Sequence, residues 1–264
     1  MSTSAAAASA ASFDRAGTRT GFFFWVSVLL LAFLVIGFAP SLYLRAFFEV
    51  PPIPAYLHVH GAILTSWFVW LVIQTAMVRT GRTATHRRLG VIGAVIAVAV
   101  VFAGPMATVG AVGRLREAGI DWDTDMSVFS NVGVEGVPMI QFAAQVVWGN
   151  FISIVVFAAL VAAAILLRRQ PETHKRLMVL ASIAIVGPAL ARISRWPVLG
   201  GEDGAFIPVV LLALLVAVIA HDLIRHRRVH VATAYGVGAI VAGVVAQQLI
   251  AATEFGRSVV RMLG

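Results

Sequence analysis

The sequence contains no cysteine, and this absence excludes several kinds of site at once. Without thiols, the chain forms no disulfide, holds no thiolate-ligated zinc ion or iron–sulfur cluster, and has no cysteine nucleophile. The sequence has a single lysine, Lys175, which lies in a short polar stretch between two apolar runs. A retinal Schiff base on a lysine inside the membrane is therefore excluded as well.

Charged residues are also scarce, at 12% of the chain, whereas 60% of the 264 residues are hydrophobic. Long apolar blocks separated by short polar stretches are the composition of a polytopic membrane protein. A helix needs about 20 apolar residues to cross a bilayer core of roughly 30 Å. The segments that meet this requirement are 21–45, 55–78, 88–112, 138–167, 176–194, 206–224 and 230–252. The sequence therefore predicts an all-α fold of seven transmembrane helices.

The formal net charge of +8 would suggest a nucleic-acid partner in a soluble protein. Here most of the 20 basic residues lie in alternate loops between the apolar segments, and most acids lie in the other loops. The positive-inside rule explains this distribution, so we expect no nucleic-acid partner. It predicts a multi-pass membrane protein with the N-terminus inside, the C-terminus outside, and basic pairs beside anionic lipid headgroups.

The domain organisation follows from the same segments. We expect a disordered tail over residues 1–20, one transmembrane domain over 21–255 and a short C-terminal tail over 256–264. Within the domain, THRRLGVIGAVIAV at 85–98 aligns with THKRLMVLASIAIV at 173–186, which is a short internal repeat. The repeated polar starts predict one helix followed by three helical hairpins.

Each copy of the repeat carries two further signals. Thr85 and Thr173 are expected to cap the helix N-termini. The pairs Gly104-Pro105 and Gly187-Pro188 are expected to kink the helices, because proline removes a backbone hydrogen bond.

The histidines on the predicted inner side are the first candidate site. His86 and His174 lie in first helical turns, where the helix dipole and neighbouring basic residues disfavour the charged imidazolium. A neutral imidazole is the form that coordinates a metal or haem iron. His221 ends a long apolar run, so we expect it to be the most buried of these histidines, and ionisable residues inside a membrane are functional candidates.

One interpretation is a b-type haem near the cytoplasmic face, held by histidines from two helices with arginines at its propionates. The expected ligand pair is His221 with either His86 or His174. His230, Arg88 and Arg176 are the other expected cofactor-binding residues. The alternative is that these histidines are ordinary interfacial residues and that the basic pairs contact lipid headgroups.

The predicted outer side offers a second polar group, formed by His58, His60, Gln141, Gln145 and Arg192. These residues could line a pocket for a quinone headgroup, a small anion or a metal ion. The alternative is that Arg192 pairs with an acid such as Glu135 or Glu254 and that the glutamines form hydrogen bonds between helices.

Several motifs carry a resemblance to known proteins. They are HxHG at His58–Gly61, HRRLG at His86–Gly90, HKRLM at His174–Met178, PAxAR at Pro188–Arg192 and RVH at Arg228–His230. With them, the chain resembles a group of uncharacterised bacterial seven-helix inner-membrane proteins, a resemblance that implies a fold and no activity. In that group a proline often follows the last histidine, where this chain has Val231.

A looser similarity, in helical hairpins with histidines at their ends, is to the cytochrome b561 type of membrane haem protein. It implies haem b and electron transfer with a redox partner, although ligand histidines of that type lie within the spans. The alternative function is a non-catalytic membrane protein that binds a lipid or small molecule, or assists assembly of a respiratory complex. Whether the protein is an enzyme is left open.

Overall fold

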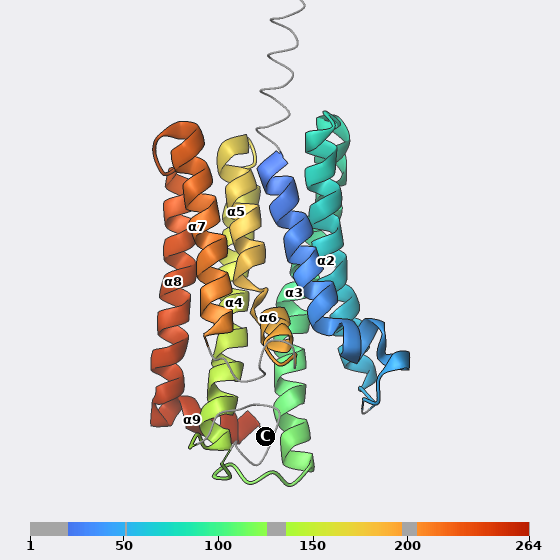
Figure 1. Ribbon diagram of the computed structural model, residues 1–264, viewed down its shortest axis with the longest axis vertical. Coiled ribbons are helices and arrows are strands. Elements are labelled where there is room, and N and C mark those ends of the chain that lie inside the picture. Colours follow the sequence, from blue (N-terminus) through green and yellow to red (C-terminus); the bar gives the residue numbers. More distant parts are fainter. Residues whose placement is uncertain (1–20, 51, 126–135, 197–204, 264) are drawn as a thin grey trace, which may run out of the picture.

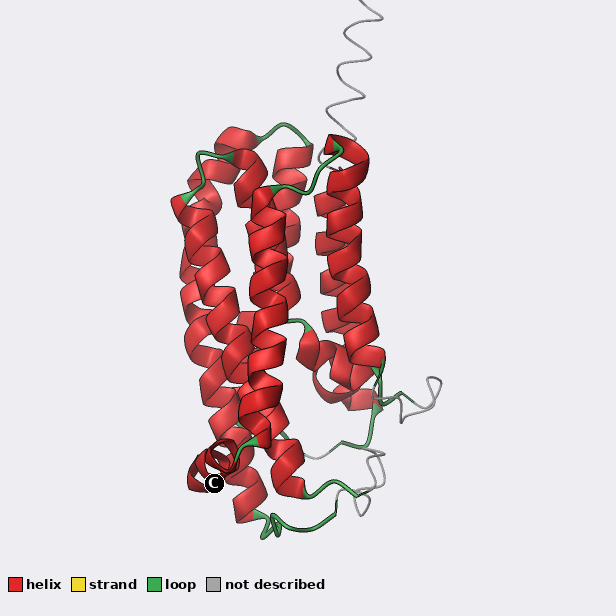
Figure 2. Ribbon diagram, turned by 90° about the vertical axis from the view of Figure 1, so that its left-hand side faces the viewer, coloured by secondary structure: helices red, strands yellow, loops and turns green. Residues whose placement is uncertain are grey.

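The structure is a computed structural model that describes residues 21–50, 52–125, 136–196 and 205–263. Of the described residues, 84% are helical, and they contain no strand, only an isolated bridge between Asp125 and Pro138. The predicted all-α class is therefore confirmed (Figure 2). The tail expected over residues 1–20 lies outside the described residues.

The helices follow the apolar segments of the sequence closely. The first span is Gly21–Tyr43, which ends in a π-helical turn, η1 (Ala39–Tyr43), and is followed by the short η2 (Arg45–Phe47). The other helices are α2 (Ala55–Arg79), α3 (Thr83–Glu117), α4 (Met139–Leu166), α5 (Pro171–Ala184), α6 (Gly187–Ile193), α7 (Phe206–His226), α8 (Val231–Ala252) and α9 (Glu254–Leu263).

Six of these helices are long and apolar enough to cross a membrane, or seven if the bent pair α5 and α6 is one span. They run side by side along one bundle axis (Figure 1). The first span, α3 and α5 begin at the same end of the bundle, which we call the upper end. The short helix α9 lies at the opposite, lower end, in the segment for which the sequence predicts a tail.

The surface of the bundle is apolar, as a lipid environment requires. Phe102, Val91 and Tyr235 are 73%, 69% and 75% exposed, and many other large apolar side chains also face outward. Inside, Trp67 of α2 packs edge-to-face on Phe157 of α4 with ring centroids 4.9 Å apart. Its indole N–H donates to Ser182 Oγ of α5 at 3.1 Å, so one buried aromatic joins three helices.

The two predicted N-caps are wrong. The cap residues are Arg82 for α3 and Gln170 for α5, and neither makes a side-chain capping bond. Both helices begin before the threonines. The backbone N–H of His86 donates to the carbonyl of Arg82, and that of His174 donates to the carbonyl of Gln170, so the first helical hydrogen bonds already start at these polar residues.

The two Gly-Pro pairs also behave differently from each other. Helix α3 runs through Pro105 without interruption. The second pair stands at a real break, because α5 ends at Ala184, α6 begins at Gly187, and the two are bent by 46°. This break turns α6 away from the line of α5, and it shapes the lower half of the bundle.

Candidate functional site

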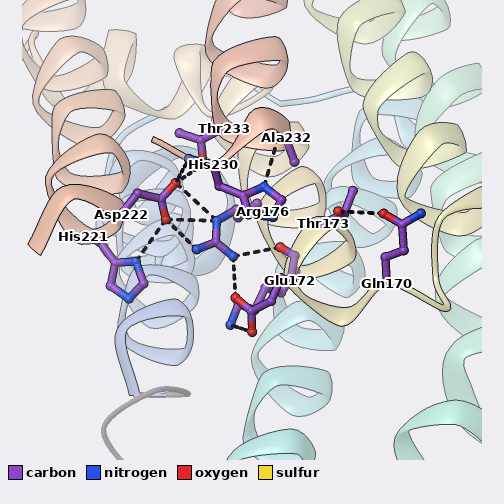
Figure 3. Close-up of polar contacts among 10 residues, drawn as sticks. Gln170, Glu172, Thr173, Arg176, His221, Asp222, His230, Ala232 and Thr233 are labelled. Carbon is purple, nitrogen blue, oxygen red and sulfur yellow. Dashed lines mark hydrogen bonds and ion pairs between the residues drawn. The ribbon is translucent and has the colours of Figure 1, made fainter. Parts of the chain in front are cut away.

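A buried ion pair near the upper end joins α5 to α7 (Figure 3). The side chains of Arg176 and Asp222 are both 0% exposed. Asp222 Oδ1 accepts hydrogen bonds from Arg176 Nη2 at 2.5 Å and from Nε at 3.0 Å. This is the two-pronged contact that a guanidinium makes with a carboxylate in water-poor surroundings.

The remaining polar atoms of this ion pair are satisfied by neighbouring groups. Asp222 Oδ2 accepts from Thr233 Oγ1 at 2.5 Å and from the backbone N–H of His230 at 3.0 Å, both at the start of α8. Arg176 Nη1 donates to the carboxylate of Glu172 at 2.7 Å and to its carbonyl at 2.9 Å. The network therefore links α5, α7 and α8, and the N–H donors of Arg176 are bound to Asp222 and Glu172.

Asp222 was not predicted as a site residue from the sequence, although the adjacent His221 was. A signal was present, because an acid that ends an apolar run of about 20 residues is expensive unless a cation meets it. The matching cation, Arg176, starts another span on the same side.

The side chain of His221 is 10% exposed. Its ring stacks on Phe22 of the first span with centroids 4.2 Å apart and meets Phe23 edge-on at 5.1 Å. Nδ1 lies 3.5 Å from Asp222 Oδ1, and neither ring nitrogen has a hydrogen bond. The ring contacts recorded for His221 are thus with the first span and with His226, rather than with His86 or His174.

His230 forms the N-cap of α8. Its Nδ1 accepts a hydrogen bond from the backbone N–H of Ala232 at 3.1 Å, which requires this nitrogen to be unprotonated. Burial, together with the nearby Arg176 guanidinium, holds the pKa of His230 below its ordinary value of 6.5. The residue is therefore a neutral cap, and only its Nε2 is free for another role.

The other two inner histidines face each other. The ring centroids of His86 on α3 and His174 on α5 are 6.2 Å apart, with the rings at 73°. Nδ1 of His174 lies 2.8 Å from the carbonyl of Ala164, so Nδ1–H donates there, and Nε2 is the nitrogen left to act as a ligand in the neutral ring. Nδ1 of His86 is buried and has no partner.

Gln74 on α2 borders the same place. Its backbone carbonyl interacts with the His86 ring. Its side chain is 9% exposed, and neither the amide nitrogen nor the amide oxygen has a hydrogen bond. Helices α2 and α3 thus each carry an unpaired polar side chain, Gln74 and His86, while Arg88 is exposed.

A conventional metal centre is not formed by these groups. In the described part of the chain, no three His, Asp or Glu residues are arranged to hold a metal ion. A haem iron needs only two axial ligands from the protein, so a histidine pair suffices for it.

The five residues predicted for the outer pocket do not come together at one site. His60 Nδ1 lies 3.0 Å from the carbonyl of Ala103, and its ring is close enough to Arg192 for their charges to interact. Gln141 instead accepts from Arg257 Nη1 of α9 at 3.4 Å. His58 and Gln145 are exposed. The structure therefore brings His60 and Arg192 together and places Gln141 in the contact with α9.

Glu254, one of the two expected acids, is not a partner of Arg192. Glu254 pairs with Arg257 at 3.0 Å and with Arg261 at 3.2 Å, and Glu135 lies outside the described residues. The Arg192 guanidinium lies over the Phe38 ring, 4.4 Å from its centroid, and its Nε is buried without a partner.

No family model matches the chain, and no curated protein or solved structure matches it either.

Proposed function

We propose that this chain is a seven-span protein of a bacterial inner membrane that binds haem b through His86 and His174 and transfers electrons. The N-terminus lies on the cytoplasmic side in this proposal, which puts the histidine pair near that face. The observation that supports it is the pairing of two histidines from different helices, with ring centroids 6.2 Å apart.

The spacing fits a shared metal atom better than a direct contact. A coordinating nitrogen lies about 2 Å from a metal, and the ring centre lies roughly 1 Å further back, so two imidazoles on one iron have centres about 6 Å apart. A direct N–H···N hydrogen bond of about 3 Å would bring the centres to about 5 Å. The observed 6.2 Å agrees with the first arrangement.

The surroundings of the pair support the same interpretation. The Ala164 carbonyl fixes the His174 tautomer that leaves Nε2 as a ligand, which is the usual outer support of a ligating histidine. Leaving buried polar atoms unpaired costs about 1–3 kcal/mol each, and both Gln74 amide atoms and His86 Nδ1 are unpaired. A bound group that meets some of these atoms would remove that cost.

The remaining inner residues take other roles in this proposal. Arg88 is exposed beside His86 and is the proposed partner of a haem propionate. Arg176 and His230 stabilise the junction of α5, α7 and α8, and His221 packs the first span against that junction. Bound haem would supply one-electron chemistry, while His86 and His174 would hold it and set its potential.

The test is an absorption spectrum of protein expressed with a supply of haem and purified in detergent. The wild type is expected to show a Soret band with near-stoichiometric haem, and His86→Ala and His174→Ala are expected to lose most of it. His58→Ala, an exposed histidine, is the matched control and should keep full haem content. A wild type without a Soret band, or full haem in both ligand variants, would refute the proposal.

A further inference from the structure

Arg192 is a cation in the lower half of the bundle that has no carboxylate partner in the described structure. It lies near the end of α6, and its Nε atom is buried without a hydrogen-bond acceptor. Its guanidinium lies over the face of the Phe38 ring. The side chain is partly buried, and no carboxylate of the described residues pairs with it. A partly buried guanidinium without a counter-charge is unfavourable, so an anion that bound here would be stabilised.

The charged groups around Arg192 increase this imbalance. Arg195, in the turn after α6, is close enough for its positive charge to act on Arg192. His60 of α2 also lies within electrostatic reach of Arg192, and its Nδ1 is 3.0 Å from the Ala103 carbonyl oxygen. Two guanidiniums and an imidazole are thus gathered with no acid beside them among the described residues.

Helix α6, which carries Arg192, packs closely against the first span. Helix α6 is turned by the 46° break after α5, and Gly37 of the first span packs directly on it. A Cβ on Gly37 would lie 2.5 Å from the Ala189 carbonyl oxygen, so only glycine permits this approach. The approach sets Phe38 under Arg192, and one turn later Ser41 has a buried hydroxyl without a partner.

From this geometry we infer that Arg192, with Arg195 and His60, forms a binding site for a phosphate group. A guanidinium offers paired N–H donors that match phosphate oxygens. Two guanidiniums favour a group that can carry more than one negative charge over a single carboxylate. A metal cation would add to the positive charge, and a neutral ligand would leave it uncompensated. This site lies apart from the His86 and His174 pair and does not depend on haem.

The same chemistry can come from a phospholipid headgroup or from a free phosphate compound. The experiment uses full-length protein stripped of lipid in detergent, with its thermal unfolding midpoint measured against added inorganic phosphate and, separately, dioleoylphosphatidylglycerol. Wild type and Arg192→Gln are compared, with Arg116→Gln, an exposed arginine near the end of α3, as the matched control.

We expect wild type and Arg116→Gln to be stabilised in a saturable way and Arg192→Gln to need at least tenfold more of the same compound. Stabilisation by the phospholipid alone assigns the site to a lipid headgroup, and stabilisation by inorganic phosphate alone assigns it to a free phosphate compound. Either result supports the inference. No saturable effect of either compound, or an equal effect on Arg192→Gln, overturns it.

Folding of the variant gives an independent check. Because Gln removes an uncompensated charge, ligand-free Arg192→Gln should unfold no lower than ligand-free wild type. A strong loss of stability without ligand would show that Arg192 has a structural partner and would also overturn the inference.

Discussion

Arg176 and Arg192 lie on the same broken span, and the chain treats them in opposite ways. Arg176 is completely buried, and its donors meet two carboxylates and a backbone carbonyl. Arg192 buries its Nε with no acceptor and rests on an aromatic ring. Burial of a charged side chain is therefore a poor guide to its role in this protein. Whether a carboxylate pairs with it distinguishes a structural arginine from one that can bind a ligand.

The difference arises from the helices that pack against each half of the span. At the upper end, α7 supplies Asp222 and α8 supplies Thr233, so the charge is neutralised inside the bundle. At the lower end the first span supplies Phe38, and α2 supplies His60, which is not an acid. The ion pair of Arg176 and Asp222 stabilises the bundle, whereas Arg192 can still bind an anion.

Removing the carboxylate of the upper pair should have the largest effect. Asp222→Asn keeps the side-chain volume but leaves the buried Arg176 with only the half-exposed Glu172 as counter-charge, so we expect the free energy of unfolding to fall by about 3–5 kcal/mol. Denaturant titration in detergent measures it. Glu172→Gln is the control: its side chain is 50% exposed, and the expected loss is about 1 kcal/mol or less. Equal losses in the two variants would contradict the structural role of the buried pair.

A smaller effect is expected where the first span meets α6. Gly37→Ala places a methyl group against the Ala189 backbone, which cannot move as a side-chain end can. Overpacking of this kind costs about 1–3 kcal/mol. The variant should also weaken phosphate binding, because Phe38 would shift under Arg192.

Gly238→Ala on α8 is the matched control, since nothing lies within 4 Å of its Cβ position. It should be neutral or slightly stabilising, because alanine favours a helix more than glycine does. If both alanine variants unfold at the same point as wild type, the close approach of the first span and α6 is not what shapes the lower site.

The smallest effect should be a pH dependence at the upper junction. His230 caps α8 in its neutral form, and its pKa is lowered in the folded protein by burial and by Arg176. The unfolded chain therefore takes up the proton first, so stability is constant above the ordinary pKa of 6.5 and falls as the pH drops below it.

Unfolding midpoints measured on both sides of that value check this prediction. His230→Asn retains a capping acceptor that does not titrate, so its stability should fall less on acidification than that of wild type. Identical pH profiles for the two proteins would show that His230 does not report on the junction.

The spans could be predicted from the sequence because burial in lipid demands long apolar runs. The prediction of 55–78 for the second helix agrees with Ala55–Arg79. The prediction of 88–112 for the third is too short, because α3 extends to Thr83 and Glu117 through polar residues that hydropathy counts as loop. Polar ends of a helix remain helical where water and headgroups satisfy their side chains.

Side-chain partnerships were harder to predict, because they depend on which helices become neighbours. The repeat places His86 and His174 at matching positions, yet nothing in the sequence says that these two rings face each other and that His221 packs on Phe22. Asp222 was missed for the same reason, since its partner lies 46 residues away on another helix. The isolation of Arg192 likewise emerges only once its neighbours are known.

The contrast between the two arginines is tested most directly by comparing Arg176→Gln with Arg192→Gln in one unfolding series, each with and without phosphate. We predict that Arg176→Gln is strongly destabilised under both conditions, because Asp222 loses its cation. Arg192→Gln should match or exceed wild type without phosphate and fail to gain stability when phosphate is added. Equal destabilisation of both variants, independent of phosphate, would contradict the account.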